Sequence, residues 1–158
     1  ILRGLEFAEG DMAVVQDADF EYDPGDLPGL LEPLVKGSSE VVYGSRFLGR
    51  GIPQGMAFPN YIANRFLTGL TNLLFGIHLT DMETCYKIIP VELMRSLQLN
   101  AQRFDFEPEV TSKLAKRGAR IAELPIRYSG RTASEGKKIK ARDFFMAIQR
   151  LLQERWKT

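Results

Sequence analysis

Apolar residues along the 158-residue chain occur in short runs and in longer stripes at helical spacing. The runs predict strands at 12–16, 40–43, 84–89 and 120–128. The stripes predict helices at 1–9, 27–35, 60–75, 90–97, 107–116 and 143–156. Because strands and helices alternate, an α/β fold is expected, and the length suits one domain or part of one.

The stretch Met12–Asp23 joins an apolar run to a dense acidic cluster. The run suits a strand buried on both faces of a parallel sheet, and open α/β sheets bind ligands beyond the ends of such strands. Alternate residues of an extended chain point the same way, so Asp17, Asp19 and Glu21 are expected to share one side. Carboxylates this close repel one another unless a cation lies among them. The cluster indicates either a divalent metal site that holds a phosphate-bearing substrate or a solvated acidic turn.

The helix expected at 60–75 carries a stripe of polar but uncharged side chains. The stripe consists of Asn60, Asn64, Thr68 and either Thr71 or Asn72. A solvated helix face usually carries Lys and Glu, so this stripe is expected either to face a ligand or to pack on polar backbone. The Gly-rich segment 47–56 before the helix is a candidate lid beside a site.

Charge is distributed unevenly, although the formal net charge is only +1. Acidic residues predominate in 1–32 and basic residues in 127–158, which suits one end of the chain to a cation and the other to an anion. In the basic loop, Arg131, Lys137 and Lys138 offer donors to phosphate oxygens, with a solvated charge run as the alternative. The loop lacks Walker spacing, and its bases are not interleaved with aromatic residues, which argues against nucleic-acid binding.

Several single residues are also candidates for chemistry. Asp81 and Glu83 lie in a polar turn and are suited either to a general base or to turn and cap interactions. Arg46 follows the second strand and either binds an anion or pairs with a carboxylate. Cys85 is the only cysteine, which excludes an internal disulfide, fits a reducing cytosolic setting and favours a packed thiol. The single His78 disfavours a histidine-based metal site.

The chain contains no signal peptide and no apolar run near the ~20 residues that a membrane span needs. It opens without an initiator Met, so we expect a fragment whose upstream part is missing. In the last expected helix, aromatic residues cluster on one face with basic residues nearby. This face is expected either to pack on the core or to lie on an anionic membrane surface.

Six short segments together resemble the polyprenyl-phosphate branch of the family-two glycosyltransferases, which includes the dolichyl-phosphate mannosyltransferases. The segments, in the order that this branch shows, are Gln16–Pro24 (QDADFEYDP), Val42–Phe47 (VYGSRF), Thr80–Lys87 (TDMETCYK), Phe104–Glu109 (FDFEPE), Glu123–Ile126 (ELPI) and Arg131–Lys138 (RTASEGKK). The first of them contains the DxD pattern of the family, and together they cover nearly the whole chain.

The resemblance implies a GT-A fold, the Rossmann-like fold of nucleotide-diphospho-sugar transferases, incomplete at the N-terminus. Residues 1–158 would be the C-terminal part of a single domain, without the upstream strands that bind the nucleotide. It further implies an inverting transfer of a hexose, glucose or mannose, from a nucleotide-diphosphate sugar to a polyprenyl phosphate, dolichyl or undecaprenyl. The enzyme would act in the cytoplasm, peripherally at the cytoplasmic face of a membrane.

The resemblance also implies roles for individual residues. Asp17 would lie near the donor as a catalytic residue and belong, with Asp19 and Glu21, to the site that holds Mg²⁺ or Mn²⁺. Many relatives have Gln at the position of Glu21, and a carboxylate there should still bind the metal. Asp81 would orient the acceptor or act as the base.

Two groups of residues would bind phosphate by the same resemblance. The acceptor phosphate would meet Arg46, Asn60 and Asn64, which gives the polar helix stripe a purpose. Arg131, Lys137 and Lys138 would close over the donor diphosphate. An ionised phosphate acceptor needs no strong general base, and a basic loop stabilises the leaving diphosphate.

Two other functions remain open from the sequence. One is a family-two glycosyltransferase that acts on a sugar or protein acceptor, with Asp81 as the base. The other is a non-catalytic metal-binding module or an inactive fragment, built on the acidic cluster alone.

Overall fold

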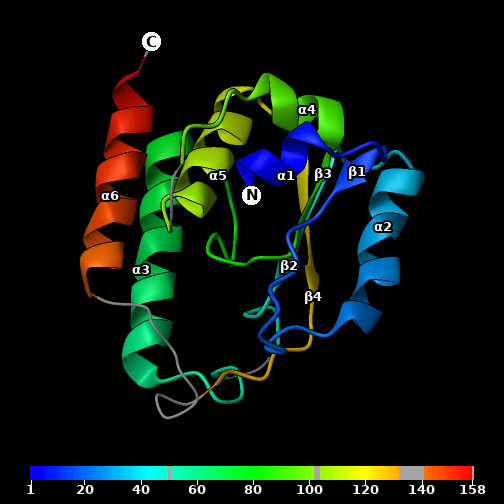
Figure 1. Ribbon diagram of the computed structural model, residues 1–158. Helices are drawn as coiled ribbons and strands as arrows, with labels where there is room; N and C mark the ends of the chain where they lie inside the picture. Colours follow the sequence, from blue (N-terminus) through cyan, green and yellow to red (C-terminus); the bar gives the residue numbers. More distant parts are fainter. Residues whose placement is uncertain (50, 102–103, 132–140, 158) are drawn as a thin grey trace.

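The computed structural model describes residues 1–49, 51–101, 104–131 and 141–157. These form four strands and six α-helices (Figure 1). The strands are β1 Met12–Ala13, β2 Val41–Ser45, β3 Lys87–Pro90 and β4 Ile121–Pro125. The helices are α1 Leu2–Glu6, α2 Leu27–Val35, α3 Phe58–Phe75, α4 Val91–Ser96, α5 Phe106–Lys116 and α6 Ala141–Trp156, and a 3₁₀ turn, Pro24–Asp26, precedes α2.

The described strands form one mixed sheet in the order β1-β3-β2-β4. β2 is parallel to β4, from Val41 opposite Ile121 to Ser45 opposite Pro125, and antiparallel to β3. Figure 1 shows α2 on one side of this sheet and α3, α5 and α6 on the other. This arrangement confirms the expected α/β class.

The alternation of side chains along β2 explains how the two helix layers are held. Val41 and Tyr43 pack in one buried cluster with Val110 of α5, whereas Val42 packs with Leu30 of α2. All five residues of β2 are buried because helices cover both faces of the sheet.

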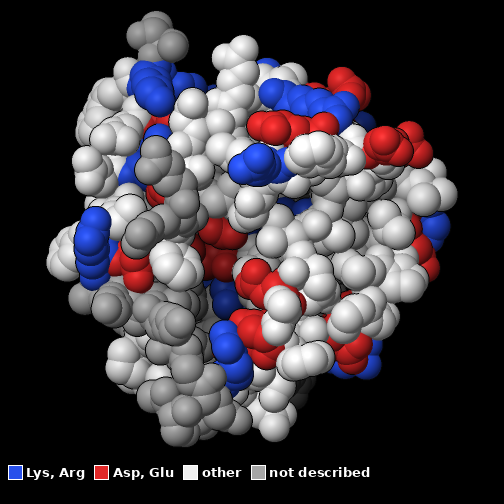
Figure 2. Space-filling model, in the orientation of Figure 1, with Lys and Arg blue, Asp and Glu red and all other residues white. Residues whose placement is uncertain are grey.

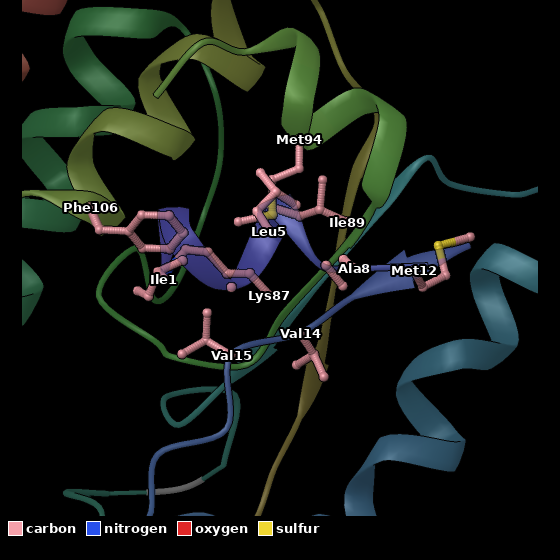
Figure 3. A pocket seen from close by; sticks show the side chains of 12 residues that line it. Ile1, Leu5, Ala8, Met12, Val14, Val15, Lys87, Ile89, Met94 and Phe106 are labelled. Carbon is pink, nitrogen blue, oxygen red and sulfur yellow. The ribbon is translucent and has the colours of Figure 1, made fainter. Parts of the chain in front are cut away.

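The first strand differs from the expectation of a doubly buried parallel strand at 12–16. β1 has only two residues and pairs antiparallel with β3 at one edge of the described sheet. Met12 and Val14 are 41% and 37% exposed, because apolar side chains here line an open pocket of about 450 Å³ between α1, β1 and α5 (Figure 3). An apolar run alone does not distinguish a central strand from the rim of such a pocket.

Helix ends follow local signals closely. α2 has the expected bounds, and α3 begins two residues before the expected start, with Pro59 in its first turn. Gly76 ends α3 in the left-handed conformation, at φ 68°.

The last helix confirms core packing for part of its aromatic face. Leu151 is fully buried and Phe144 packs beside it against α3, while Phe145 and Trp156 are 67% and 73% exposed. In the described part of the chain, no helix is both long and apolar enough to cross a membrane.

Candidate active site

A cleft of about 700 Å³ opens beyond the ends of β2 and β4, where the acidic stretch meets the segment that follows β4. Its lining comes from the acidic stretch, the end of β2, α3, the segment before β3, the start of α5 and the segment after β4. It includes Asp17, Asp19, Glu21, Arg46, Asn60, Asn64, Glu83, Cys85, Glu107, Tyr128 and Arg131. Figure 2 shows acidic side chains gathered in the central hollow of this face, with basic side chains next to them. The cleft therefore collects seven of the eight described residues proposed from the sequence.

The acidic wall of the cleft is built around the guanidinium of Arg131. Its Nη2 lies 2.7 Å from Oδ2 of Asp19, and its Nε lies 3.3 Å from Oε1 of Glu21. The backbone N–H of Arg131 also donates to Glu21, as does the hydroxyl of Tyr128 at 2.7 Å. The two regions of opposite charge thus meet at this wall, where the arginine binds carboxylates.

Asp19 and Glu21 come together by a different route from the one expected. The stretch is not extended, because Phe20 has φ 59° and the backbone N–H of Glu21 donates to Oδ1 of Asp19. Asp17 also lines the cleft but has another partner, the thiol of Cys85, with Sγ 2.8 Å from Oδ2. The turn separates Asp17 from the other two carboxylates.

These contacts test the expected metal site at Asp17, Asp19 and Glu21. Among the residues that the structure describes, no three His, Cys, Asp or Glu side chains are grouped so that they could hold a metal ion. Each carboxylate already accepts hydrogen bonds from protein donors, and the cation between Asp19 and Glu21 is the guanidinium. This arrangement does not fit a three-carboxylate site for Mg²⁺ or Mn²⁺, so metal binding stays a prediction.

Arg46 and Asp81 form a two-point ion pair under the cleft. Nε lies 2.7 Å from Oδ2 and Nη2 lies 2.7 Å from Oδ1, with side-chain exposures of 8% and 0%. Burial lowers the pKa of Arg46, but the charge of Asp81 more than offsets this and holds that pKa well above its ordinary value. Of the two interpretations of Arg46, the structure shows the one in which Arg46 pairs with a carboxylate. Both oxygens of Asp81 are occupied by this pair, so its expected role as a base has no support in the geometry.

Glu123 is a positioning residue that the sequence did not single out. From β4, its carboxylate accepts the backbone N–H groups of Thr80 and Asp81, at 2.7 and 3.0 Å. It thereby orients the turn that presents Asp81 to Arg46. The ELPI segment contained this residue, but only the pairing of β4 with β2 brings it to the turn.

The polar stripe on α3 divides into two halves, one of which confirms the expected packing on polar backbone, whereas a ligand-facing role for the other stays a prediction. Asn60 and Asn64 line the cleft. Further along, Thr68 accepts the backbone N–H of Met82 at 3.0 Å, and Asn72 hydrogen-bonds both backbone groups of Leu79. The second half is thus packed on polar backbone, while the first is available to a ligand.

The floor of the cleft is formed by Glu83, Cys85 and Glu107, from the segment before β3 and the start of α5. Burial raises the pKa of the Cys85 thiol, and the carboxylate of Asp17 adds to this, which confirms a packed rather than a reactive thiol. Glu107 lies in the expected FDFEPE segment, but it was not singled out.

The structure describes the basic loop as far as Arg131. Lys137 and Lys138 lie outside the described residues, so their role toward a diphosphate stays a prediction. Before α3, the Gly-rich segment contacts the residues before Arg131, because the backbone N–H of Gly130 donates to Gln54 at 2.9 Å. Its proposed role as a lid likewise stays a prediction.

Comparison with known proteins identifies the class. Residues 1–97 match the model of glycosyl transferase family 2, and the chain belongs to this family. The chain also resembles a solved structure over 96% of its own length and 52% of the other's, with a TM-score of 0.69 and 20% identity. That structure is glucosyl-3-phosphoglycerate synthase from Mycobacterium tuberculosis in complex with phosphoglyceric acid. The fold is therefore GT-A, as expected.

Curated relatives belong to the expected branch. The chain is 30% identical to undecaprenyl-phosphate mannosyltransferase of Micrococcus luteus over 80% of its own length and 53% of the relative's. It is 29% identical to UDP-N-acetylglucosamine–dolichyl-phosphate N-acetylglucosaminyltransferase of Methanococcus voltae, over 74% and 47% respectively. The chain is 24% identical to dolichol-phosphate mannosyltransferase of Pyrococcus furiosus, over 96% of its own length and 42% of the relative's. The chain thus spans about half the length of these relatives.

Proposed function

We propose that this chain forms the acceptor side and part of the donor side of an enzyme that transfers a hexose from a nucleotide-diphosphate sugar to a polyprenyl phosphate. The observation that carries the proposal is the composition of the cleft. The cleft is lined by the guanidinium of Arg131 beside Asp19 and by the neutral amides of Asn60 and Asn64 from α3. Cationic and neutral donors in one cleft suit two phosphate-bearing substrates.

In the proposed reaction, an oxygen of the acceptor phosphate attacks the anomeric carbon of the hexose. The bond from that carbon to the diphosphate oxygen breaks, and the nucleoside diphosphate leaves with the electron pair. Arg131 is suited to stabilise the negative charge on the leaving group, once the diphosphate takes the place of Asp19 and Glu21 as its partner.

The acceptor oxygen is already ionised near neutral pH, so the reaction requires no strong base. This agrees with Asp81, whose carboxylate is engaged by Arg46. Asp81 instead acts through Arg46, which it holds in place at the cleft. The guanidinium carbon of Arg46 also lies 5.4 Å from the centroid of the Tyr128 ring.

Because the acceptor is a lipid, the enzyme is expected to work peripherally at the cytoplasmic face of a membrane. Membrane contact is inferred from the substrate alone, since no helix among the described residues could span a membrane. The divalent metal and the identity of the hexose belong to the proposal as expectations, with Mn²⁺ and Mg²⁺ as the ions to test.

The proposal is tested with labelled nucleotide sugars and three acceptors: polyprenyl phosphate, a soluble phosphate ester and a soluble sugar. The assay uses the chain and, where its gene encodes further residues, the full-length protein. Label should pass into the lipid fraction with polyprenyl phosphate alone. Transfer to a soluble acceptor alone, or to none of the three by the full-length protein, would overturn the proposed acceptor.

A charge change at Asn64 tests whether this residue binds the acceptor phosphate. Asn64→Asp places a carboxylate beside the expected acceptor phosphate and should raise the KM for polyprenyl phosphate at least tenfold, with little change in the KM for the donor. Asn100→Asp introduces the same charge at an exposed position outside the cleft and should leave both constants unchanged.

A further inference from the structure

The floor of the cleft holds two carboxyl groups that have no role in the function proposed above. Glu83 precedes β3 and Glu107 lies in the first turn of α5, so the tertiary fold brings them together from positions 24 residues apart. Both line the same cleft, and the charge of Glu107 contributes to raising the pKa of Glu83.

Among the described residues, the buried Lys87 acts electrostatically on both carboxyl groups and lowers their pKa values. Lys87 donates to the backbone carbonyl of Thr84, and its Nζ lies 4.9 Å from the centroid of the Tyr43 ring. Only 3% of Lys87 is exposed. Its charge balances one carboxylate, so the second carboxyl group is more stable in its neutral form.

One oxygen of Glu83 is unsatisfied in the part of the chain that the structure describes. This atom, Oε1, is buried and has no hydrogen-bond partner among the described residues. Burial raises the pKa of Glu83 to about 8, an effect to which Glu107 and Asp81 add and which Lys87 and Arg46 oppose. With a pKa of about 8, the carboxyl group of Glu83 is mainly protonated at neutral pH and offers the cleft that it lines one donor and one acceptor.

Leaving a buried polar atom without a hydrogen bond is costly. A ligand that hydrogen-bonds to Oε1 of Glu83 therefore gains affinity. Phosphate does not suit this position, because the neighbouring carboxyl of Glu107 repels anions. A hydroxyl group suits it well, since it both donates and accepts. Two carboxyl groups side by side match the neighbouring hydroxyls of a sugar ring.

We propose that Glu83 and Glu107 form the pocket for the hydroxyl groups of the transferred hexose and select among hexoses. The inference rests on the proposed function, since it names the part of the cleft that holds the sugar of the donor. It assigns the sugar to the floor, below the two phosphate-binding walls.

The test compares two ligands, a nucleotide-diphosphate hexose and the corresponding nucleoside diphosphate, by their Kd values for the chain. The Kd of the nucleoside diphosphate divided by the Kd of the nucleotide-diphosphate hexose isolates the contribution of the sugar. Glu83→Ala should reduce this ratio about tenfold and leave the Kd of the nucleoside diphosphate unchanged, which also shows that the variant is folded. Glu107→Ala should act in the same direction, and Glu9→Ala, an exposed control outside the cleft, should have no effect.

A conservative variant provides a second readout. Glu83→Gln keeps one donor and one acceptor at the same place and should retain most of the sugar contribution. In the wild type that contribution should fall as the pH rises through about 8, where Glu83 ionises, whereas in Glu83→Gln it should not.

The outcomes separate the two proposals. If the nucleoside diphosphate binds but Glu83→Ala and Glu107→Ala leave the ratio unchanged, the sugar pocket is wrong and the proposed function stands. An equal loss for both ligands would also overturn the pocket. If neither ligand binds the wild-type chain or its full-length form, the proposed function fails and the pocket fails with it.

Discussion

The guanidinium of Arg46 and the carboxylate of Asp81 face each other through two hydrogen bonds of 2.7 Å, and the Asp81 side chain is completely buried. The backbone N–H of Arg46 adds a third bond to the same carboxylate, at 3.0 Å. This pair joins the end of β2 to the turn before β3, and it fixes one side of the cleft.

Asp81→Asn should lower the free energy of unfolding by about 3–5 kcal/mol, because it leaves the buried charge of Arg46 without its partner. Urea unfolding measures the change. The double variant Arg46→Met and Asp81→Leu should recover part of the loss, since it removes both buried charges. Glu32→Gln breaks an exposed ion pair with Lys36 and should leave stability unchanged. Equal stability of Asp81→Asn and Glu32→Gln would contradict the structural role of the pair.

Arg131→Gln should strengthen Mn²⁺ binding several-fold in the absence of nucleotide, because Asp19 and Glu21 lose the cation that lies between them. The same variant should bind a nucleoside diphosphate about tenfold more weakly. Electron paramagnetic resonance of free Mn²⁺ measures the first effect. Arg127→Gln is the matched control, since Arg127 pairs with acidic residues of the nearby 3₁₀ turn and does not line the cleft. If both variants bind Mn²⁺ like the wild type, the guanidinium does not compete with a metal here.

Gly55→Ala should destabilise the protein by about 2 kcal/mol or more. Gly55 has φ 73°, and a Cβ there would lie 2.1 Å from the carbonyl oxygen of Gly130. Thermal unfolding measures the loss, and the position of Arg131 should change with it. Gly69→Ala, on the exposed face of α3 with no atom near its Cβ, should instead stabilise by about 0.5–1 kcal/mol. If Gly55→Ala is as stable as the wild type, the segments that contain Gly55 and Gly130 can move apart at little cost.

The stability of the wild type should fall between about pH 4.5 and pH 8 through Glu83. The folded chain keeps a proton on this group up to about pH 8, whereas the unfolded chain releases it near the ordinary pKa of 4.5. Stability contributed by this proton is present below pH 4.5 and is lost as the pH rises, by up to about 1.4 kcal/mol per unit within the window.

Glu83→Gln isolates this effect, because Glu107 and Glu123 also titrate from raised pKa values. The difference in unfolding free energy between variant and wild type should grow with pH in favour of the variant and level off above pH 8. Urea unfolding at several pH values measures it. A difference that does not change with pH would mean that Glu83 is ionised throughout.

The helices and the fold class follow from the sequence because their signals are local. The stripes of apolar residues and the residues at the helix ends, such as Pro59 and Gly76, act within a few positions of one another. The family also follows from the sequence, since six short segments in a fixed order carry it. Strand β1 shows the limit, because its apolar residues line an open pocket at the sheet edge and are not covered on both faces.

The partners of the charged residues were decided by the tertiary structure. The sequence identified Asp19, Glu21 and Arg131 as chemically important, but it could not show that they bind one another across more than 100 positions. It likewise left open whether Arg46 binds an anion or a carboxylate. Electrostatic pairing depends on distance and burial, which local patterns do not contain. For the same reason, only the fold brings Glu83 and Glu107 to the lining of one cleft, where burial raises the pKa of Glu83.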